Sequence, residues 1–255
     1  MMRLFDTHAH LLSERFDEDR EAVIMGLPQQ GVIGLIEVGT TVADSENAVR
    51  LAHQTGFIYA AAGVHPHEAA EAERDYIDRL RTLAAQPKVV AIGEIGLDYH
   101  YDFSPRDVQR EVFGRQLELA RALERPVIIH MREATQDTLS ILREHKETRG
   151  VMHCFSGSAE TAELCLELGL HISFTGSVTF KNARKVVEAA AVVPMDRLMA
   201  ETDCPYLSPE PVRGRRNDPS NVRLVLEKLA EIKGVKPEEL AETNIRNAKE
   251  LFGIQ

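Results

Sequence analysis

Leu4-Phe5-Asp6-Thr7-His8-Ala9-His10 is an apolar lead that runs directly into two histidines two residues apart. We interpret this stretch as a short strand, in which alternate residues share a face, so that His8 and His10 point the same way with Asp6 beneath them. Neutral imidazole nitrogen is a common ligand of zinc and similar divalent ions. Taken alone, the spacing fits two solvated histidines equally well, and the rest of the chain must decide between these interpretations.

The pattern of that first stretch recurs along the chain. Apolar runs alternate with amphipathic stretches about eight times, without a break in composition. One of the expected helices has Ser104 as its cap and Pro105 at its first position. The expected strands are 3–5, 32–38, 57–64, 89–97, 127–129, 150–152, 172–176 and 198–200, and the other expected helices include 18–27, 45–53, 69–85, 186–193, 221–232 and 238–252.

Eight strand–helix repeats predict an α/β protein with a single (β/α)8 TIM barrel spanning residues 1–255 as one domain. An open doubly wound sheet is the alternative. No glycine-rich nucleotide-binding loop follows the first strand run, and this favours the barrel.

Composition limits the class of function. The formal net charge of −10 argues against a protein that coats DNA by electrostatics alone. It leaves room for an enzyme that grips a phosphate through bound metal ions, which can be the largest local charges in a site. No apolar run approaches the ~20 residues of a membrane span. Three cysteines without a repeated spacing predict free thiols and a cytoplasmic location.

Side chains that can bind a metal follow the apolar strand runs. In a barrel the carboxyl ends of the strands meet on one face, where active sites lie. We therefore expect one shared metal site. Its nitrogen and oxygen donors suit Zn²⁺, Mn²⁺, Fe²⁺ or Co²⁺ and, less well, Mg²⁺. The expected ligands are His8, His10, Glu94, His130, His153 and Asp203.

Six ligands are more than one catalytic ion usually takes, so we expect two ions, at roughly 3.5–4 Å from each other. His8 and His10 would hold one ion, His130 and His153 would hold the other, and Glu94 would bridge them. Asp203 would bind a metal and accept the proton of the attacking water, which makes Asp203 and Glu94 the expected catalytic residues.

Several motifs spread over the chain carry a family resemblance. They are Asp6-Thr7-His8-Ala9-His10, Gly63-Val64-His65-Pro66-His67, Gly93-Glu94-Ile95-Gly96-Leu97-Asp98, Val127-Ile128-Ile129-His130-Met131-Arg132, His153-Cys154-Phe155-Ser156-Gly157 and Glu201-Thr202-Asp203-Cys204-Pro205-Tyr206-Leu207. In these motifs the chain resembles the TatD-related metal-dependent deoxyribonucleases, a branch of the amidohydrolase-like barrels, over essentially its whole length. The resemblance implies metal roles for the six expected ligands, and 3′-to-5′ exonuclease or related phosphodiester hydrolysis. A D-aminoacyl-tRNA deacylase activity is also attached to relatives.

Other polar residues near the expected site form a second group, whose predicted role is to bind substrate. His65 would contact a substrate phosphate, Arg132 would clamp one bidentately, and Glu201 would orient a metal ligand. Arg213 and Arg215 lie in a loop after the eighth strand run and could guide a nucleic-acid backbone. The alternatives are a surface ion pair for Arg132 and a solvated cluster for the arginine loop.

Three hypotheses for function remain. The first is a two-metal deoxyribonuclease acting on DNA ends or single strands. The second keeps the activated water but cleaves an acyl ester or amide, as in a D-aminoacyl-tRNA. The third is a metal-binding protein without catalysis, and the complete ligand set argues against it.

Overall fold

The computed structural model describes residues 1–255. Its eight strands belong to one sheet in which the spatial order equals the order in sequence, β1 to β8. Consecutive parallel strands joined by helices give the topology of the predicted (β/α)8 barrel. The strands are β1 (Leu4–Ala9), β2 (Val32–Val38), β3 (Ile58–Ala62), β4 (Val89–Asp98), β5 (Val127–Arg132), β6 (Gly150–Met152), β7 (His171–Phe174) and β8 (Leu198–Ala200).

Contacts between residues group the chain into two compact units. Unit 1 comprises residues 1–37, 154–163 and 172–255, and unit 2 comprises residues 38–153 and 164–171. Helix α6 (Ala159–Glu167) contains the boundary at residue 163. The prediction of one domain over 1–255 stays a prediction.

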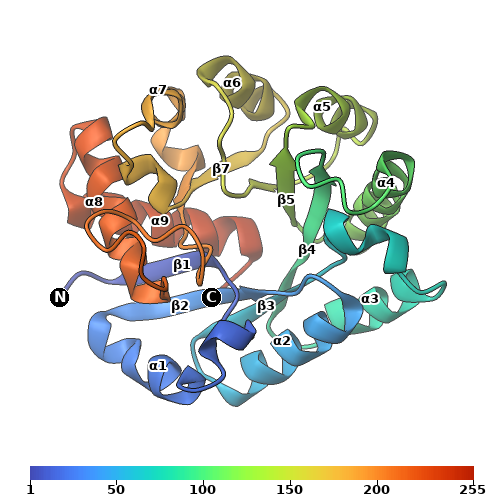
Figure 1. Ribbon diagram of the computed structural model, residues 1–255, viewed down its shortest axis with the longest axis horizontal. Coiled ribbons are helices and arrows are strands. Elements are labelled where there is room, and N and C mark those ends of the chain that lie inside the picture. Colours follow the sequence, from blue (N-terminus) through green and yellow to red (C-terminus); the bar gives the residue numbers. More distant parts are fainter. The chain divides into compact units, whose positions relative to one another are not determined.

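Unit 1 contains α1 (Arg20–Gly26), α7 (Arg184–Val192), α8 (Val222–Lys233) and α9 (Pro237–Phe252). Figure 1 shows α8 and α9 beside each other, and both contact β1. The side-chain amide of Asn244 on α9 accepts a hydrogen bond from the backbone N–H of Ala200 at 2.9 Å. It donates one to the carbonyl of Phe5 at 2.8 Å. One buried amide therefore links β1 to β8.

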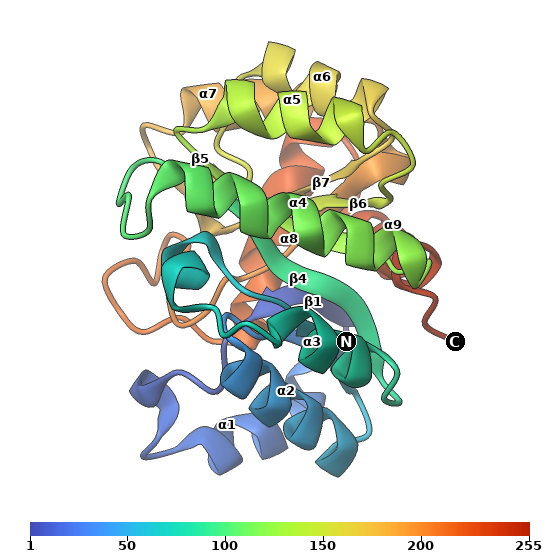
Figure 2. The same cartoon turned by 90° about the vertical axis from the view of Figure 1, so that its right-hand side faces the viewer.

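Unit 2 contains α2 (Val42–Gln54), α3 (Tyr76–Ala84), α4 (Arg106–Ala122) and α5 (Thr135–Glu144). Helix α4 runs across β4, as Figure 2 shows. All ten residues of β4 are buried, because helices and neighbouring strands cover it on both faces. Gly96 has φ +142°, and a Cβ there would lie 2.0 Å from the carbonyl oxygen of His130. The absence of a side chain at Gly96 therefore lets β4 approach β5 closely at His130, the first polar residue of β5.

Most predicted elements agree with the structure within a few residues, but two predictions are wrong. The expected helix 69–85 is a 3₁₀ helix, Pro66–Glu71, followed by a separate α3. The predicted start of α4 is also wrong, because Ser104 does not cap it and Pro105 is the residue before its first position, Arg106. The Ser104 hydroxyl instead donates to the carbonyl of His67 and accepts the N–H of Ala70, at 2.8 and 3.0 Å. These two hydrogen bonds tie Ser104 to the 3₁₀ helix instead of to α4.

No helix has both the length and the apolar character needed to cross a lipid bilayer.

Candidate metal centre

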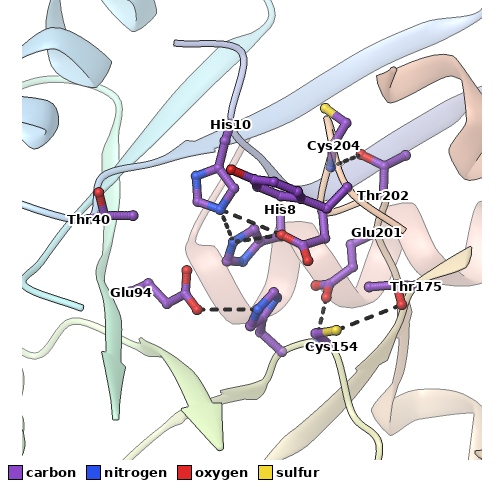
Figure 3. Close-up of polar contacts among 12 residues, drawn as sticks. His8, His10, Thr40, Glu94, Cys154, Thr175, Glu201, Thr202 and Cys204 are labelled. Atoms are coloured by element: carbon purple, nitrogen blue, oxygen red, sulfur yellow. Dashed lines mark hydrogen bonds and ion pairs between the residues drawn. The ribbon is translucent and has the colours of Figure 1, made fainter. Parts of the chain in front are cut away.

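Three imidazole nitrogens of unit 2 converge on one carboxylate oxygen. Oε1 of Glu94 lies 2.9 Å from Nδ1 of His130, 3.3 Å from Nε2 of His153 and 3.4 Å from Nε2 of His65. The Glu94 side chain is 3% exposed. Burial of a carboxylate is costly unless it is paired, so these three contacts are what makes its position tolerable. Figure 3 shows Glu94 with its dashed contact to an imidazole.

Backbone pairing places the members of this group. β4 and β5 are parallel neighbours, with Ile95 opposite Ile129 and Gly96 opposite His130. The N–H of His153 donates to the carbonyl of Ile129 at 3.0 Å, which continues the pairing of β6 with β5 beyond Met152. Regular pairing thus places His130 and His153 at neighbouring strand ends, while Glu94 lies where the register of β4 against β5 shifts, between Ile92 and Ile95.

Asp98 connects this group to a further histidine. Its Oδ2 lies 3.0 Å from Nε2 of both His130 and His67. Burial acts to raise the pKa of Asp98, but the hydrogen bonds from His130 and His67 outweigh it and hold that pKa below its ordinary value. Asp98 is therefore a buried anion that orients two imidazoles.

The pKa values of His130 and His65 are shifted in opposite directions. Burial acts to lower the pKa of His130, but hydrogen bonds to Asp98 and Glu94 more than compensate, and its pKa is raised. Burial, which is the main cause, lowers the pKa of His65 to about 4. Nδ1 of His65 accepts the N–H of His67 at 3.2 Å, so its proton is on Nε2, which faces Glu94.

A second group lies in unit 1. Nε2 of His8 and Nε2 of His10 are 3.0 Å apart, and Oδ1 of Asp203 lies 3.9 and 3.6 Å from them. Figure 3 shows the two rings with these contacts. His8 is fully buried, whereas His10 and Asp203 are each 15% exposed. The shared face predicted for His8 and His10 is present.

Hydrogen bonds tie β1 to the segment after β8. Both oxygens of the buried Asp6 accept hydrogen bonds from Thr202, through its N–H and its hydroxyl. The N–H of Asp203 donates to the carbonyl of His8 at 3.0 Å. Asp203 itself has φ +54°, in the left-handed region where aspartate is one of the few residues that is tolerated. These bonds turn its carboxylate toward the two histidines. Desolvation raises the pKa of Asp6 well above its usual range.

Glu201 is fully buried next to this group. Its Oε1 accepts the backbone N–H of Cys154 at 2.6 Å, and Sγ of Cys154 lies 3.8 Å from the hydroxyl of Thr175 (Figure 3). Cys204 is buried as well, as expected of a packing residue.

Of the five expected substrate residues, His65 lies within the Glu94 group and Glu201 is buried beside the His8 and His10 group, whereas the three arginines are exposed. Arg132 is exposed, and its guanidinium lies 4.7 Å from the centre of the Tyr101 ring. Arg213 lies 4.1 Å from the centre of the Phe180 ring, and Arg215 is exposed. The neighbouring Arg216 is held differently, because it forms two 2.7 Å hydrogen bonds with Asp19.

The residues of both groups fit divalent metal ions. A neutral imidazole carries one N–H, so only one of the two nitrogens of His130 can donate to a carboxylate, and the other can bind a cation. The two Nε2 atoms of His8 and His10 lie close enough together to share one cation, and the adjacent carboxylate of Asp203 supplies negative charge. A divalent ion in either group would provide the positive charge that buried carboxylates need.

Comparison with known proteins identifies the family. The family model of TatD related DNase matches residues 5–253. The chain belongs to the TatD-related DNase family. It is 47% identical over 253 residues to a metal-dependent hydrolase, YabD, of Bacillus subtilis, with 98% of this chain and 99% of YabD covered. It is 38% identical over 259 residues to a protein of Pantoea vagans named 3′-5′ ssDNA/RNA exonuclease TatD, covering 98% and 100%.

A crystal structure supports the fold as well as the family. The TatD homologue YjjV of Escherichia coli superposes with a TM-score of 0.93 at 31% identity, over 100% of this chain and 99% of YjjV. This TatD-family chain is accordingly a metal-dependent hydrolase with the (β/α)8 barrel fold predicted from its sequence.

Two residues of the histidine and carboxylate group around Glu94, His67 and Asp98, were not predicted from the sequence. His67 lies in the 3₁₀ helix and contacts Asp98, although no sequence pattern assigned it a role. Asp98 ends the apolar run of β4, just as Glu94 sits within it, and this position was the available signal. Its partners could not be read from the sequence, because they come from two other segments.

Proposed function

We propose that this TatD-family hydrolase is a 3′-to-5′ deoxyribonuclease that acts on DNA ends or single strands. The observation that carries the proposal is the convergence of three imidazole nitrogens within 3.4 Å of one buried oxygen of Glu94. Histidine and carboxylate groups of this kind suit a hydrolytic metal ion, and the chain belongs to a family with relatives named as exonucleases.

The proposal includes two divalent ions, with zinc, manganese and magnesium as the candidates. In a (β/α)8 barrel the carboxyl ends of all strands face one side, which is the reason for assigning both histidine groups to one centre. His8, His10 and Asp203 would hold one ion, His130 and His153 the other, and Glu94 would bridge them. Nitrogen and oxygen donors alone are present in this set, as these ions prefer.

When bound, such ions supply Lewis acidity that lowers the pKa of water and neutralises phosphate charge. Asp203 then accepts the proton of the attacking water, since its carboxylate is partly exposed and turned toward His8 and His10. Glu201 orients the Cys154 backbone beside it. His65, whose Nε2 lies 3.4 Å from Oε1 of Glu94, would contact a substrate phosphate beside that carboxylate. Arg132, Arg213 and Arg215 would bind the nucleic-acid backbone.

An assay of substrate classes tests this function. Protein of measured metal content is incubated with single-stranded DNA, duplex DNA, RNA, a D-aminoacyl-tRNA and small esters. We expect mononucleotides from the 3′ end of DNA, and loss of that activity in Asp203→Asn. Deacylation of D-aminoacyl-tRNA by a protein that leaves every phosphodiester intact would overturn the proposal in favour of ester hydrolysis. Metal binding without any hydrolysis would favour the non-catalytic alternative.

We also propose a cytoplasmic location. All three cysteines are free thiols in the structure, which is typical of a reducing compartment.

A further inference from the structure

Two aromatic side chains of unit 2 are exposed and stacked on each other. Tyr101 is 49% and Phe103 is 68% exposed, whereas most aromatic side chains of the molecule are buried or half-buried. Their ring centres are 5.3 Å apart and the ring planes 23° from parallel. Two exposed rings forgo most of the free energy that their burial would give. Their exposure therefore indicates a surface that another group covers.

The segment that carries this pair is rigid. Oδ1 of Asp98 accepts the backbone N–H groups of His100 and Tyr101, at 3.0 and 2.8 Å. Farther along, the carbonyl of Ser104 accepts Nε2 of Gln109 at 2.8 Å. Gln109 is itself buried, and it also bonds the N–H of Asp98 at 2.9 Å. Both ends of the segment are therefore fixed, and the rings are held in place before any ligand arrives.

The aromatic pair adjoins the histidine group around Glu94. The His67 ring meets Phe103 at 4.9 Å and Tyr101 at 5.4 Å between centres, in both cases edge to face. Through Asp98, His67 is linked to His130. One imidazole and one carboxylate thus separate the exposed rings from an expected metal ligand.

A cation lies at the same surface. The exposed guanidinium of Arg132 is 4.7 Å from the centre of the Tyr101 ring. With Phe103 stacked on Tyr101 as well, the more exposed ring of Phe103 is the one with room for a further flat group. A flat π-system joined to a negative charge would satisfy both the ring and the arginine.

We propose that Phe103, backed by Tyr101, is a stacking platform for the terminal nucleobase of a single strand, with Arg132 binding an adjoining phosphate. The inference rests on the proposed nuclease function and adds where the base lies. Stacking accepts every base, so the platform predicts little sequence preference. A terminal base in a duplex is already paired and stacked, so the platform predicts a preference for unpaired ends.

The test compares ring variants on matched oligonucleotides. For Phe103→Ala and Phe103→Leu we expect KM for a short single strand to rise about tenfold, or about 1.4 kcal/mol, with kcat within about twofold. Phe103→Trp should retain the low KM, because it keeps a π face that leucine lacks. Met25→Ala is the control, since Met25 on α1 is 74% exposed and apolar. An unchanged KM in Phe103→Leu would overturn the platform.

A second substrate separates stacking from a general loss of folding. An oligonucleotide whose 3′-terminal residue is abasic should bind the wild type about tenfold more weakly, and Phe103→Ala should weaken it no further. An equal loss on both oligonucleotides would overturn the inference.

A binding measurement separates this inference from the nuclease proposal. A 3′-terminal 2-aminopurine on a cleavage-resistant phosphorothioate strand should lose fluorescence on stacking with the wild type and with Phe103→Trp. It should stay bright with Phe103→Leu. Quenching by a protein that cleaves no nucleic acid would contradict the nuclease proposal and leave the platform standing, whereas cleavage without quenching would do the reverse.

Discussion

Oε1 of Glu94 lies 2.9 Å from Nδ1 of His130, although 36 positions separate the two residues in the chain. The pair results from the parallel register of β4 and β5, in which Ile95 faces Ile129 and Gly96 faces His130. Glu94 itself lies where the register shifts, between Ile92 and Ile95, and the regular pairing that resumes at Ile95 brings His130 beside it.

Replacement of Glu94 tests its role as a metal ligand. Glu94→Gln keeps the shape but removes the charge that three imidazole nitrogens face. We expect fewer bound ions per chain by elemental analysis and a fall in kcat of about 100-fold or more. Glu118→Gln, on the exposed face of α4, is the control. Full metal content and activity in Glu94→Gln would contradict the assignment.

Asp98 should stabilise the metal-free protein. Its pKa is held below the ordinary value, so its contribution is present above about pH 4 and is lost as the pH falls further. Asp98→Asn leaves His130 and His67 without their anion, and we expect a loss of about 3 kcal/mol in urea unfolding at pH 7. The difference from wild type should narrow in acid. Equal free energies of unfolding for wild type and Asp98→Asn at pH 7 would show that the negative charge of Asp98 does not stabilise the fold.

The Asp19–Arg216 ion pair predicts a pH effect in unit 1. Hydrogen bonding to Arg216 lowers the pKa of Asp19, so the pair stabilises above the ordinary pKa of aspartate and is lost as the pH falls through the lowered pKa. Asp19→Asn should therefore melt below the wild type at pH 7, with the gap closing in acid. A gap that widens in acid would have the wrong sign for this pair.

The arginines of the 213–216 loop should differ in salt dependence. Arg215 is exposed, whereas Arg216 is bound to Asp19. Arg215→Ala should reduce the slope of log K against log salt for single-stranded DNA by about 0.7–1. Arg216→Ala should lower the melting temperature with a smaller change in slope. Equal slopes for wild type and Arg215→Ala would remove Arg215 from the substrate contacts.

One domain over residues 1–255 predicts one unfolding event. We expect a single calorimetric transition whose calorimetric and van't Hoff enthalpies agree. Two separable transitions would instead show that the units at 1–37, 154–163 and 172–255, and at 38–153 and 164–171, unfold independently.

The sequence determined the repeating pattern of this protein. Apolar strand runs are recognisable in the sequence because each strand must be buried. The runs at 32–38, 150–152 and 198–200 were predicted with the bounds that the structure shows. His130 and His153 could be named because each follows such a run, and Glu94 because it is a carboxylate within one. The pairing of His8 with His10 needed only the two-residue period of a strand.

Tertiary structure alone decided the contacts that join separate segments. The Ser104 hydroxyl forms hydrogen bonds with the backbones of His67 and Ala70 instead of capping α4. Local helix propensity contains no information on such distant partners. Likewise Asp98 gained its partners His67 and His130 from two other segments. A hydrogen bond depends on atoms within about 3 Å, and only the folded path of the chain brings distant residues to that distance.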